Sequence, residues 1–148
     1  MVNKRVYFDN CAYNRPFDDQ SQIKIALETE AKKHIQQLIV EKNIDLVYSY
    51  INRLENDDNP FTTRKNSIND FFKNAVFYID SSHAGVVEEK AAIIMQTGIK
   101  PRDALHIACA IESECGYFIT TDKPLLRHTP SDIVVCSPIR FLDYLEEI

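Results

Sequence analysis

The chain of 148 residues has only three glycines, six prolines and no tryptophan. It has no low-complexity tract, so the collagen-like and disordered classes are excluded. No apolar run approaches the ~18 residues that span a bilayer. The N-terminal stretch reaches Asp9 after a short apolar run, unlike a secretory signal peptide. With a hydrophobic share of 45%, these absences indicate a globular protein without a membrane segment. We expect it to be cytoplasmic, with a single domain over residues 1–148.

Several motifs that mark common enzyme classes are also missing. HExxH, GxxxxGK[ST], GxSxG and GxGxxG do not occur, which argues against zinc-protease, P-loop, serine-hydrolase and dinucleotide-binding functions. No CxxC pair is present, so the cysteines do not indicate a zinc site, and a disulfide is not expected in a reducing compartment. We expect small buried thiols at Cys11, Cys109, Cys115 and Cys136.

The net charge of −5 argues against a protein that grips nucleic acid through a broad basic face. This net charge does not exclude a nuclease that uses metal ions. Four clustered site carboxylates would account for most of this negative charge, and two divalent ions would balance them. The acidity is therefore consistent with a local, metal-compensated site.

Short apolar strands alternate with helices along the chain. We expect strands at residues 4–9, 44–48, 117–121 and 133–136, and a weakly extended stretch at 76–79. Helices are expected at residues 21–42, 49–57, 62–74, 84–97, 101–115 and 138–145, and a loop at 10–20. Strands that are apolar on both faces are typical of a parallel sheet covered by helices. The sequence thus predicts an α/β fold, a three-layer α/β/α sandwich around a mostly parallel sheet of four to five strands.

Four acids, Asp9, Glu55, Asp103 and Asp122, lie where the predicted elements begin or end. In open α/β sheets, sites form beyond the carboxyl ends of the strands. Asp9 and Asp122 follow strands directly, so both are expected at that edge. Carboxylates that converge there would suit hard divalent cations, with Mg²⁺ or Mn²⁺ preferred over softer metals.

Each acid also has a structural interpretation. Asp9 could form a hydrogen-bonded turn, and Asp103 could be favoured by the dipole at a helix N-terminus. Asp122 could be an N-cap, and Glu55 could be a solvated helix residue.

Other polar residues compete for roles near these acids. Glu28 and Glu30 compete with Glu55, but we expect them on a solvated helix face beside Lys24, Lys32 and Lys33. His106 lies one turn after Asp103. On an apolar helix, we expect it to be a core or site-rim residue rather than a metal ligand.

Three segments resemble the best-marked parts of the PIN-domain family, which includes the VapC-like ribonuclease toxins. They are Val6–Asn10, Asp103–Ala108 and Phe118–Lys123, and the resemblance covers nearly the full length in the right order. The resemblance implies an α/β/α sandwich and Mg²⁺- or Mn²⁺-dependent cleavage of RNA. By analogy with the family, the products would carry 3′-hydroxyl and 5′-phosphate ends.

Carried over by motif, the catalytic and metal-binding acids of this resemblance are Asp9, Asp103 and Asp122, with Glu55 as the second acid. The stretch from Ser49 to Glu55 is similar to the family's serine followed six residues later by a helix glutamate.

Several residues flank the predicted edge and are candidates for substrate contacts. Thr121 matches the hydroxyl residue often found beside the last acid of the family. Tyr13 or Phe17 could stack on a base. The candidates for polar contacts with substrate are Asn10, Arg15, Arg102, Thr121 and Lys123, with Lys100 and Arg127 as further phosphate contacts.

If the toxin analogy holds, a small antitoxin would block the site, and the chain would pair as a homodimer. A processing nuclease would use the same chemistry. One alternative is a non-catalytic PIN-like module that binds RNA or protein. A phosphatase with Asp9 as nucleophile is a weaker alternative, because it would need an aspartate where Cys11 stands.

Overall fold

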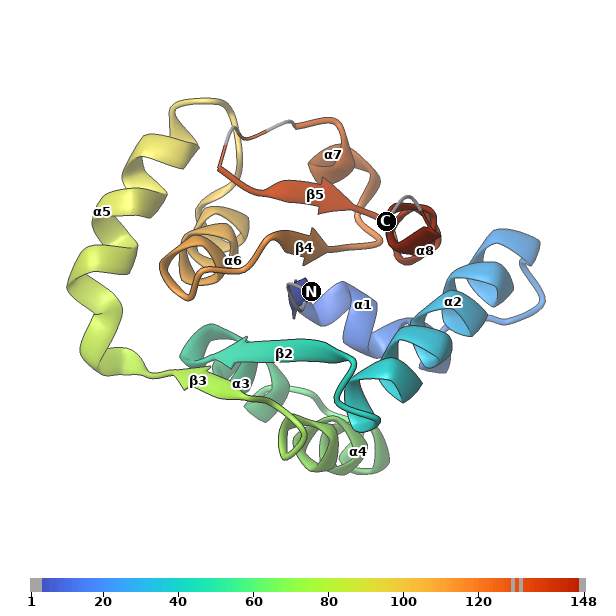
Figure 1. Cartoon of the computed structure of the whole chain (residues 1–148). Coiled ribbons are helices and arrows are strands. Elements are labelled where there is room, and N and C mark those ends of the chain that lie inside the picture. Colours follow the sequence, from blue (N-terminus) through green and yellow to red (C-terminus); the bar gives the residue numbers. More distant parts are fainter. Residues whose placement is uncertain (1–3, 129, 131, 147–148) are drawn as a thin grey trace.

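A five-stranded sheet forms the centre of the protein in a computed structural model that describes residues 4–128, 130 and 132–146. The strand order is β3-β2-β1-β4-β5, and every neighbouring pair is parallel. Figure 1 shows β2 and β3 on one side of the sheet and β4 and β5 on the other. The strands are β1 (Lys4–Phe8), β2 (Ile44–Ser49), β3 (Phe77–Ile79), β4 (Tyr117–Ile119) and β5 (Val134–Cys136). The prediction of an α/β sandwich with a parallel sheet is confirmed, and the weakly extended stretch at 76–79 contains the edge strand β3.

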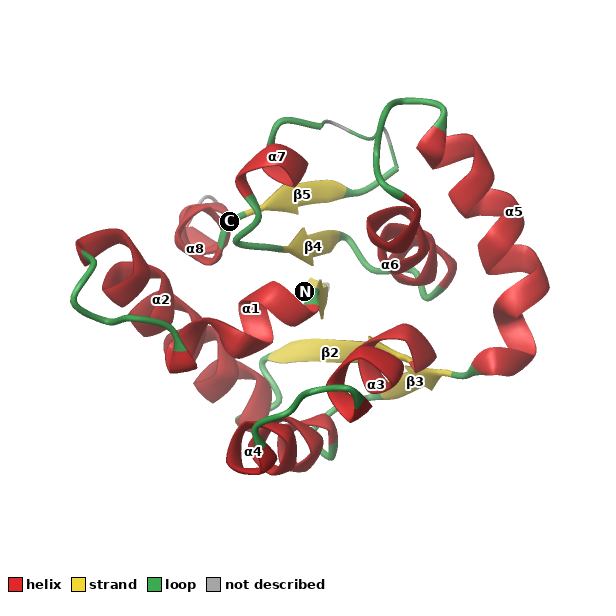
Figure 2. Ribbon diagram, turned by 180° about the vertical axis from the view of Figure 1, so that it is seen from behind, coloured by secondary structure: helices red, strands yellow, loops and turns green. Residues whose placement is uncertain are grey.

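Helices cover both faces of this sheet (Figures 1 and 2). Their bounds are α1 (Asn10–Asn14), η1 (Arg15–Phe17), α2 (Ile23–Val40), α3 (Tyr50–Asp57), α4 (Thr62–Phe72), η2 (Ser81–His83), α5 (Ala84–Met95), α6 (Pro101–Glu112), α7 (Lys123–Leu126) and α8 (Pro138–Glu146). Helices α5 and α6 pack on one face, and α1, α2, α4 and α8 pack on the other. None of the helices within the described residues is long and apolar enough to cross a membrane.

The alternation of side chains along β1 explains why both faces are covered. Tyr7 points into the core beneath α5 and α6, whereas Val6 and Phe8 point into the core beneath α2 and α8. All three side chains are fully buried. A strand that is apolar on both faces is stable only between two layers, and this places β1 at the centre of the sheet.

The loop predicted at residues 10–20 is wrong, because residues 10–17 form α1 and η1. The reason is local. Asp9 adopts an extended conformation and accepts a hydrogen bond from the Ala12 amide, so it caps a helix that starts immediately after β1. The short helix α7 was not predicted as an element either, although Pro124 is suited to its first turn.

Three expectations about burial are also wrong. Cys11 is exposed rather than buried, although the other cysteines are buried thiols. Glu28 and Lys32 were expected on a solvated face of α2, but each is only 3% exposed. The cause is tertiary, because η1 and α4 lie against α2 on the side where these residues stand.

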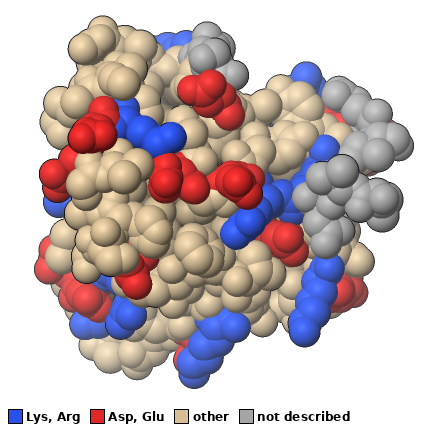
Figure 3. Space-filling model, turned by 60° about the vertical axis from the view of Figure 1, so that its left-hand side comes forward, with Lys and Arg blue, Asp and Glu red and all other residues tan. Residues whose placement is uncertain are grey.

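The surface charge follows the composition. Acidic and basic side chains are interspersed on the face shown in Figure 3, and the described residues drawn there form no broad basic area.

Candidate active site at the carboxyl edge of the sheet

Asp9 lies directly beyond the central strand. Its backbone N–H donates to the Ile119 carbonyl at 3.1 Å, which fixes it beside the end of β4. Its carboxylate accepts from the Ala12 N–H at 3.0 Å and from the Thr120 hydroxyl. Asp9 is 3% exposed, and burial raises its pKa from 3.8 to about 6, although the bonds from Thr120 and Ala12 lower it. Asp9 therefore both caps α1 and holds an unfavourable buried charge at the sheet edge.

Asp103 and Asp122 approach the same edge from two other elements. Asp103 is in the first turn of α6, and Asp122 is the N-cap residue of α7. The Asp122 side chain makes no cap hydrogen bond, so capping does not account for its carboxylate. Desolvation, followed by the charge of Asp122, raises the pKa of Asp103. Two acids that are far apart in sequence thus repel each other across one site.

The charges of all four predicted acids act on the thiol of Cys11. Its pKa is raised to about 12, first by desolvation and then by the charges of Asp9, Asp122, Asp103 and Glu55. Cys11 stands in the first turn of α1. The charges of all four predicted acids therefore act on the first turn of α1, while their assembly into one site remains a prediction.

Glu55 on α3 is held by a histidine rather than left in solvent. The Nε2 atom of His106 lies 2.5 Å from Glu55 Oε1, and Arg102 lies 3.8 Å from the same oxygen. The Glu55 side chain is 26% exposed, whereas the His106 side chain is only 2% exposed. His106 is thus a buried positioning residue for Glu55, which agrees with its expected place at the site rim.

A chain of buried hydrogen bonds continues behind His106. The Tyr7 hydroxyl lies 2.6 Å from His106 Nδ1 and 2.6 Å from the Ser49 hydroxyl. Tyr7 is fully buried, and its pKa is raised well above 10, chiefly by desolvation. The sequence indicated His106 only as a core or site-rim residue. Its spacing of three from Asp103, on the same helix face, is the available signal for this role.

Sequence reasoning missed Asn52, which ties three elements together at the edge. Its amide group donates to the Phe8 carbonyl at 3.0 Å and to Asn10 Oδ1 at 2.8 Å. Its oxygen accepts from the Ser49 N–H at 3.0 Å, completing a capping box at the start of α3. The serine three residues before Asn52 is the signal that could have identified it.

Of the predicted substrate contacts, two are already engaged within the protein and a third is buried. Asn10 is 8% exposed and donates to the Asn52 carbonyl. Arg15 pairs with Asp18 at 3.0 Å and with Glu28 at 3.5 Å. Thr121 is buried, and its hydroxyl has no hydrogen-bond partner among the described residues.

The other predicted contacts are more accessible. Arg102 is 53% exposed beside Glu55, and Lys123 is exposed at the start of α7. Lys100 and Arg127 are exposed as well. Tyr13 cannot stack on a base without rearrangement, because it is 1% exposed. Its ring packs edge to face against Phe8 and Phe72 in the core.

Two hollows flank α1 beside the acids. One has a volume of about 550 Å³ and is lined by Asp122, Lys123 and Arg15 among others. The other has a volume of about 250 Å³ and includes Glu55 and Arg64 in its lining. Asn14 lines both, so Asp122 and Glu55 are reached from two sides of one helix, whereas Asp9 and Asp103 line neither hollow.

The chemical type of the donor atoms at these acids, which are carboxylate oxygens, suits a hard divalent cation. Repulsion and desolvation already disfavour the charged forms of these carboxylates, which a cation would favour. Within the part of the chain that the structure describes, no three or more His, Cys, Asp or Glu side chains are arranged so that they could hold one metal ion. The backbone positions converge, but the side chains as placed do not form a closed coordination shell.

Comparison with known proteins supports the fold. The chain matches neither a protein-family model nor a curated protein. The structure is similar, with a TM-score of 0.53, to a chain of VapBC2 from Rickettsia felis. That chain comes from a crystal structure of VapBC2 bound to a DNA fragment from the VapBC2 promoter. The two chains share 16% sequence identity, and the match covers 88% of this chain and 96% of the other. At this identity the likeness shows the fold alone, and it confirms the PIN-like α/β/α architecture that the three sequence segments predicted.

Proposed function

We propose that this protein is a metal-dependent endoribonuclease that hydrolyses phosphodiester bonds of RNA. The observation that supports the proposal is that Asp9, Asp122, Asp103 and Glu55 all raise the pKa of the Cys11 thiol in the first turn of α1. Structural roles account poorly for so many acids at one sheet edge, since the pKa values of Asp9 and Asp103 are both raised there. In open α/β sheets, sites form beyond the carboxyl ends of the strands, and Asp9 and Asp122 come after β1 and β4 in the chain.

Asp9, Asp103 and Asp122 are the residues that would hold Mg²⁺ or Mn²⁺, with Glu55 as the second acid. When bound, such an ion supplies a Lewis acid that polarises a phosphoryl oxygen and offsets its charge. Thr120 orients the Asp9 carboxylate through its hydroxyl, while the backbone of α1 holds the other oxygen.

The protein's own residues supply positioning around this centre. His106 holds Glu55 at the edge of the site, and Tyr7 fixes the opposite nitrogen of the imidazole ring. Arg102 is exposed and lies 3.8 Å from Glu55, so it can contact a phosphate that approaches the acids. Lys123 lines the larger hollow and is suited to the same role on the other side of α1.

The biological setting that we propose is a toxin paired with a small antitoxin protein, with the nuclease itself as a homodimer. The similar chain comes from VapBC2, a complex described as bound to DNA from their promoter. Together with the resemblance of the sequence to VapC-like toxins, this favours a toxin over a processing nuclease.

The decisive experiment is cleavage of a defined RNA with single-stranded loops, in Mn²⁺ and in Mg²⁺, with EDTA as a blank. The matched variants are Asp103→Asn, which removes a site charge, and Asp143→Asn, which removes one that is 56% exposed on α8. Cleavage that is lost only in Asp103→Asn supports the proposal. Cleavage that persists unchanged in Asp103→Asn identifies a contaminant and overturns it.

Growth of cells that express the chain with and without the neighbouring gene tests the biological setting. Arrest that the neighbour relieves supports a toxin, whereas normal growth with an active nuclease favours a processing role.

One observation favours a second candidate, a non-catalytic PIN-like module that binds RNA or protein. Glu55 is already paired with His106 and Arg102, and the described acids form no group of three ligands. RNA binding that is independent of Mn²⁺, with no cleavage by the pure protein, would identify this function instead.

A further inference from the structure

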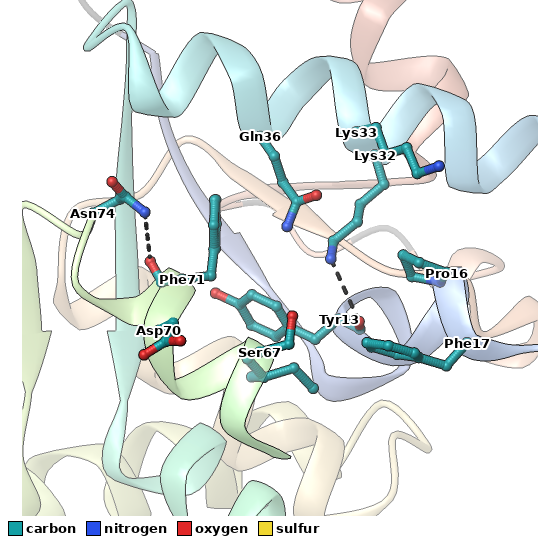
Figure 4. A pocket seen from close by; sticks show the side chains of 11 residues that line it. Tyr13, Pro16, Phe17, Lys32, Lys33, Gln36, Ser67, Asp70, Phe71 and Asn74 are labelled. Atoms are coloured by element: carbon teal, nitrogen blue, oxygen red, sulfur yellow. Dashed lines mark hydrogen bonds between the residues drawn. The ribbon is translucent and has the colours of Figure 1, made fainter. Parts of the chain in front are cut away.

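A separate cavity of about 340 Å³ lies between α1, α2 and α4 (Figure 4). None of the four acids lines it. Its walls combine apolar side chains, including Pro16, Phe17 and Phe71, with a few polar groups. This volume is at the lower end of the range of about 300–1,000 Å³ that is typical of small-molecule sites.

A buried lysine extends into this cavity without a counter-charge. Lys32 is 3% exposed, and its ammonium group donates to the Tyr13 carbonyl at 3.4 Å (Figure 4). No carboxylate of the described residues lies within salt-bridge distance of it. Desolvation by burial lowers the pKa of Lys32 from 10.5 to about 7. A lysine is almost never this buried unless it is paired.

The other charges at the mouth of the cavity are already paired, which singles Lys32 out. Lys33, the next residue, points away from the cavity and lies 3.5 Å from Glu30 (Figure 4). Asp70 on α4 pairs with Lys73 at 3.1 Å. An anion that enters the cavity would therefore meet one uncompensated cation.

A second buried group in the cavity also lacks a partner. The Tyr13 hydroxyl is fully buried and makes no hydrogen bond to any described residue. Its ring lies 5.3 Å from the Lys32 ammonium, and the Gln36 side chain lines the cavity beside it (Figure 4). Buried polar groups are nearly always satisfied, so an unpartnered hydroxyl in a residue that lines the cavity indicates a cavity that takes a polar ligand.

We propose that this cavity binds a small organic acid, whose carboxylate or phosphate group pairs with Lys32. Its apolar body would lie against the apolar side chains that line the cavity, which include Phe17 and Phe71. A charge-assisted bond between the anionic group and the ammonium is a strong one. A nucleic acid strand does not suit the cavity, because the cavity offers a single buried cation instead of a row of exposed ones.

Titration of ¹⁵N-labelled full-length protein, followed by NMR, tests the proposal. The probes are 3-phenylpropionate and phenyl phosphate, which share a ring and differ in the anionic group. The controls are 3-phenylpropanol, which lacks the charge, and inorganic phosphate, which lacks the ring. We expect saturable shifts of the Tyr13, Lys32 and Gln36 amides with a Kd of about 1 mM or tighter for at least one acid. The acid that binds more tightly identifies the preferred head group.

Two neighbouring lysines on α2 provide matched variants. Lys32→Met removes the buried charge and retains the apolar stem, whereas Lys33→Met removes a charge that points away. We expect Lys32→Met to weaken binding of the acid by about tenfold or more, and Lys33→Met to leave it within about twofold. Circular dichroism confirms that each variant is folded.

Three results would each overturn the proposal. They are no saturable shift with either acid, equal affinity for the uncharged alcohol, and unchanged affinity of the folded Lys32→Met variant. Because no step of the test uses RNA or metal, failure of the ribonuclease proposal would leave its outcome intact.

Discussion

Replacing Asp9 by asparagine should stabilise the metal-free protein, even though it removes the central acid of the site. The pKa of Asp9 is about 6 in the folded state, against 3.8 for an ordinary aspartate, so the fold favours the protonated form. Below about pH 4 the side chain is protonated in both states and carries no penalty. As the pH rises to about 6, the unfolded chain releases its proton first, and the folded state loses stability progressively.

The size of this stabilisation follows from the rise in the Asp9 pKa from 3.8 to about 6. At 1.36 kcal/mol per unit, ionised Asp9 destabilises the fold by about 3 kcal/mol above pH 7. An asparagine keeps an oxygen for the Ala12 N–H, and its amide can donate to the Thr120 hydroxyl. At 2–4 °C per kcal/mol for a chain of this size, Asp9→Asn should therefore melt roughly 6–12 °C higher than the natural protein near pH 8.

The assay is thermal unfolding in EDTA, monitored by circular dichroism, between about pH 4 and pH 8. The expected gap between Asp9→Asn and the natural protein opens through about pH 4–6 and stays constant above. Asp143→Asn, at an exposed position on α8, is the control and should show no such gap. A variant that melts at or below the natural protein at pH 8 would refute the reasoning. It would mean that Asp9 stabilises the fold as a cap more than its buried charge destabilises it.

Addition of millimolar Mg²⁺ completes the same experiment. A cation that binds only the folded state stabilises it by about 2.7 kcal/mol at a hundredfold excess over Kd. The natural protein should therefore approach the melting temperature of Asp9→Asn, while the variant changes little. A melting curve of the natural protein that does not respond to Mg²⁺ or Mn²⁺ would contradict the metal assignment.

Three further predictions concern the residues around the site and the second cavity. His106→Leu should lower kcat for RNA by about 10–100-fold at unchanged KM, because Glu55 loses its buried partner, whereas His106→Gln retains a donor and should stay closer to the natural rate. An equal loss in both variants would contradict this. Lys32→Met should raise the free energy of unfolding in urea by about 4 kcal/mol at pH 7, because the lowered lysine pKa destabilises the fold, and the gain should shrink as the pH rises toward about 10. A gain in the free energy of unfolding that is constant with pH would show that better apolar packing of the methionine, and not loss of the lysine charge, stabilises the variant. Asn52→Leu should lower the free energy of unfolding by about 2–4 kcal/mol in urea, because the Phe8 carbonyl loses a buried donor, and a neutral effect would show that Asn52 does not hold the edge together.

The sequence was sufficient to predict the layered α/β fold, because the signals involved are local. Strand β1 is apolar on both faces, and only a central position between two helical layers buries both. Asp9 follows β1 directly and Asp122 comes three residues after the end of β4, and the ends of parallel strands meet at one edge whatever the remaining packing is. The neighbourhood of these acids was therefore predictable from their positions in the chain, while their chemistry remains a prediction.

The same local reasoning failed where burial depends on which helix lies against which. Lys32 was expected to be a solvated helix residue, but it is buried against Tyr13 of α1, at the cavity between α2 and α4. Cys11 was expected to be a core thiol, but it lies on the exposed side of the capped helix α1. His106 meets Glu55 only because α6 and α3 pack side by side on the sheet.

Periodicity and strand-end chemistry thus determined the architecture and the edge where the acids gather, since both depend on residues close together in the chain. The pairing of His106 with Glu55 and the isolation of the Lys32 charge were decided by tertiary structure alone. Desolvation and long-range hydrogen bonds are properties of the packed molecule, because they arise from segments that the sequence keeps far apart.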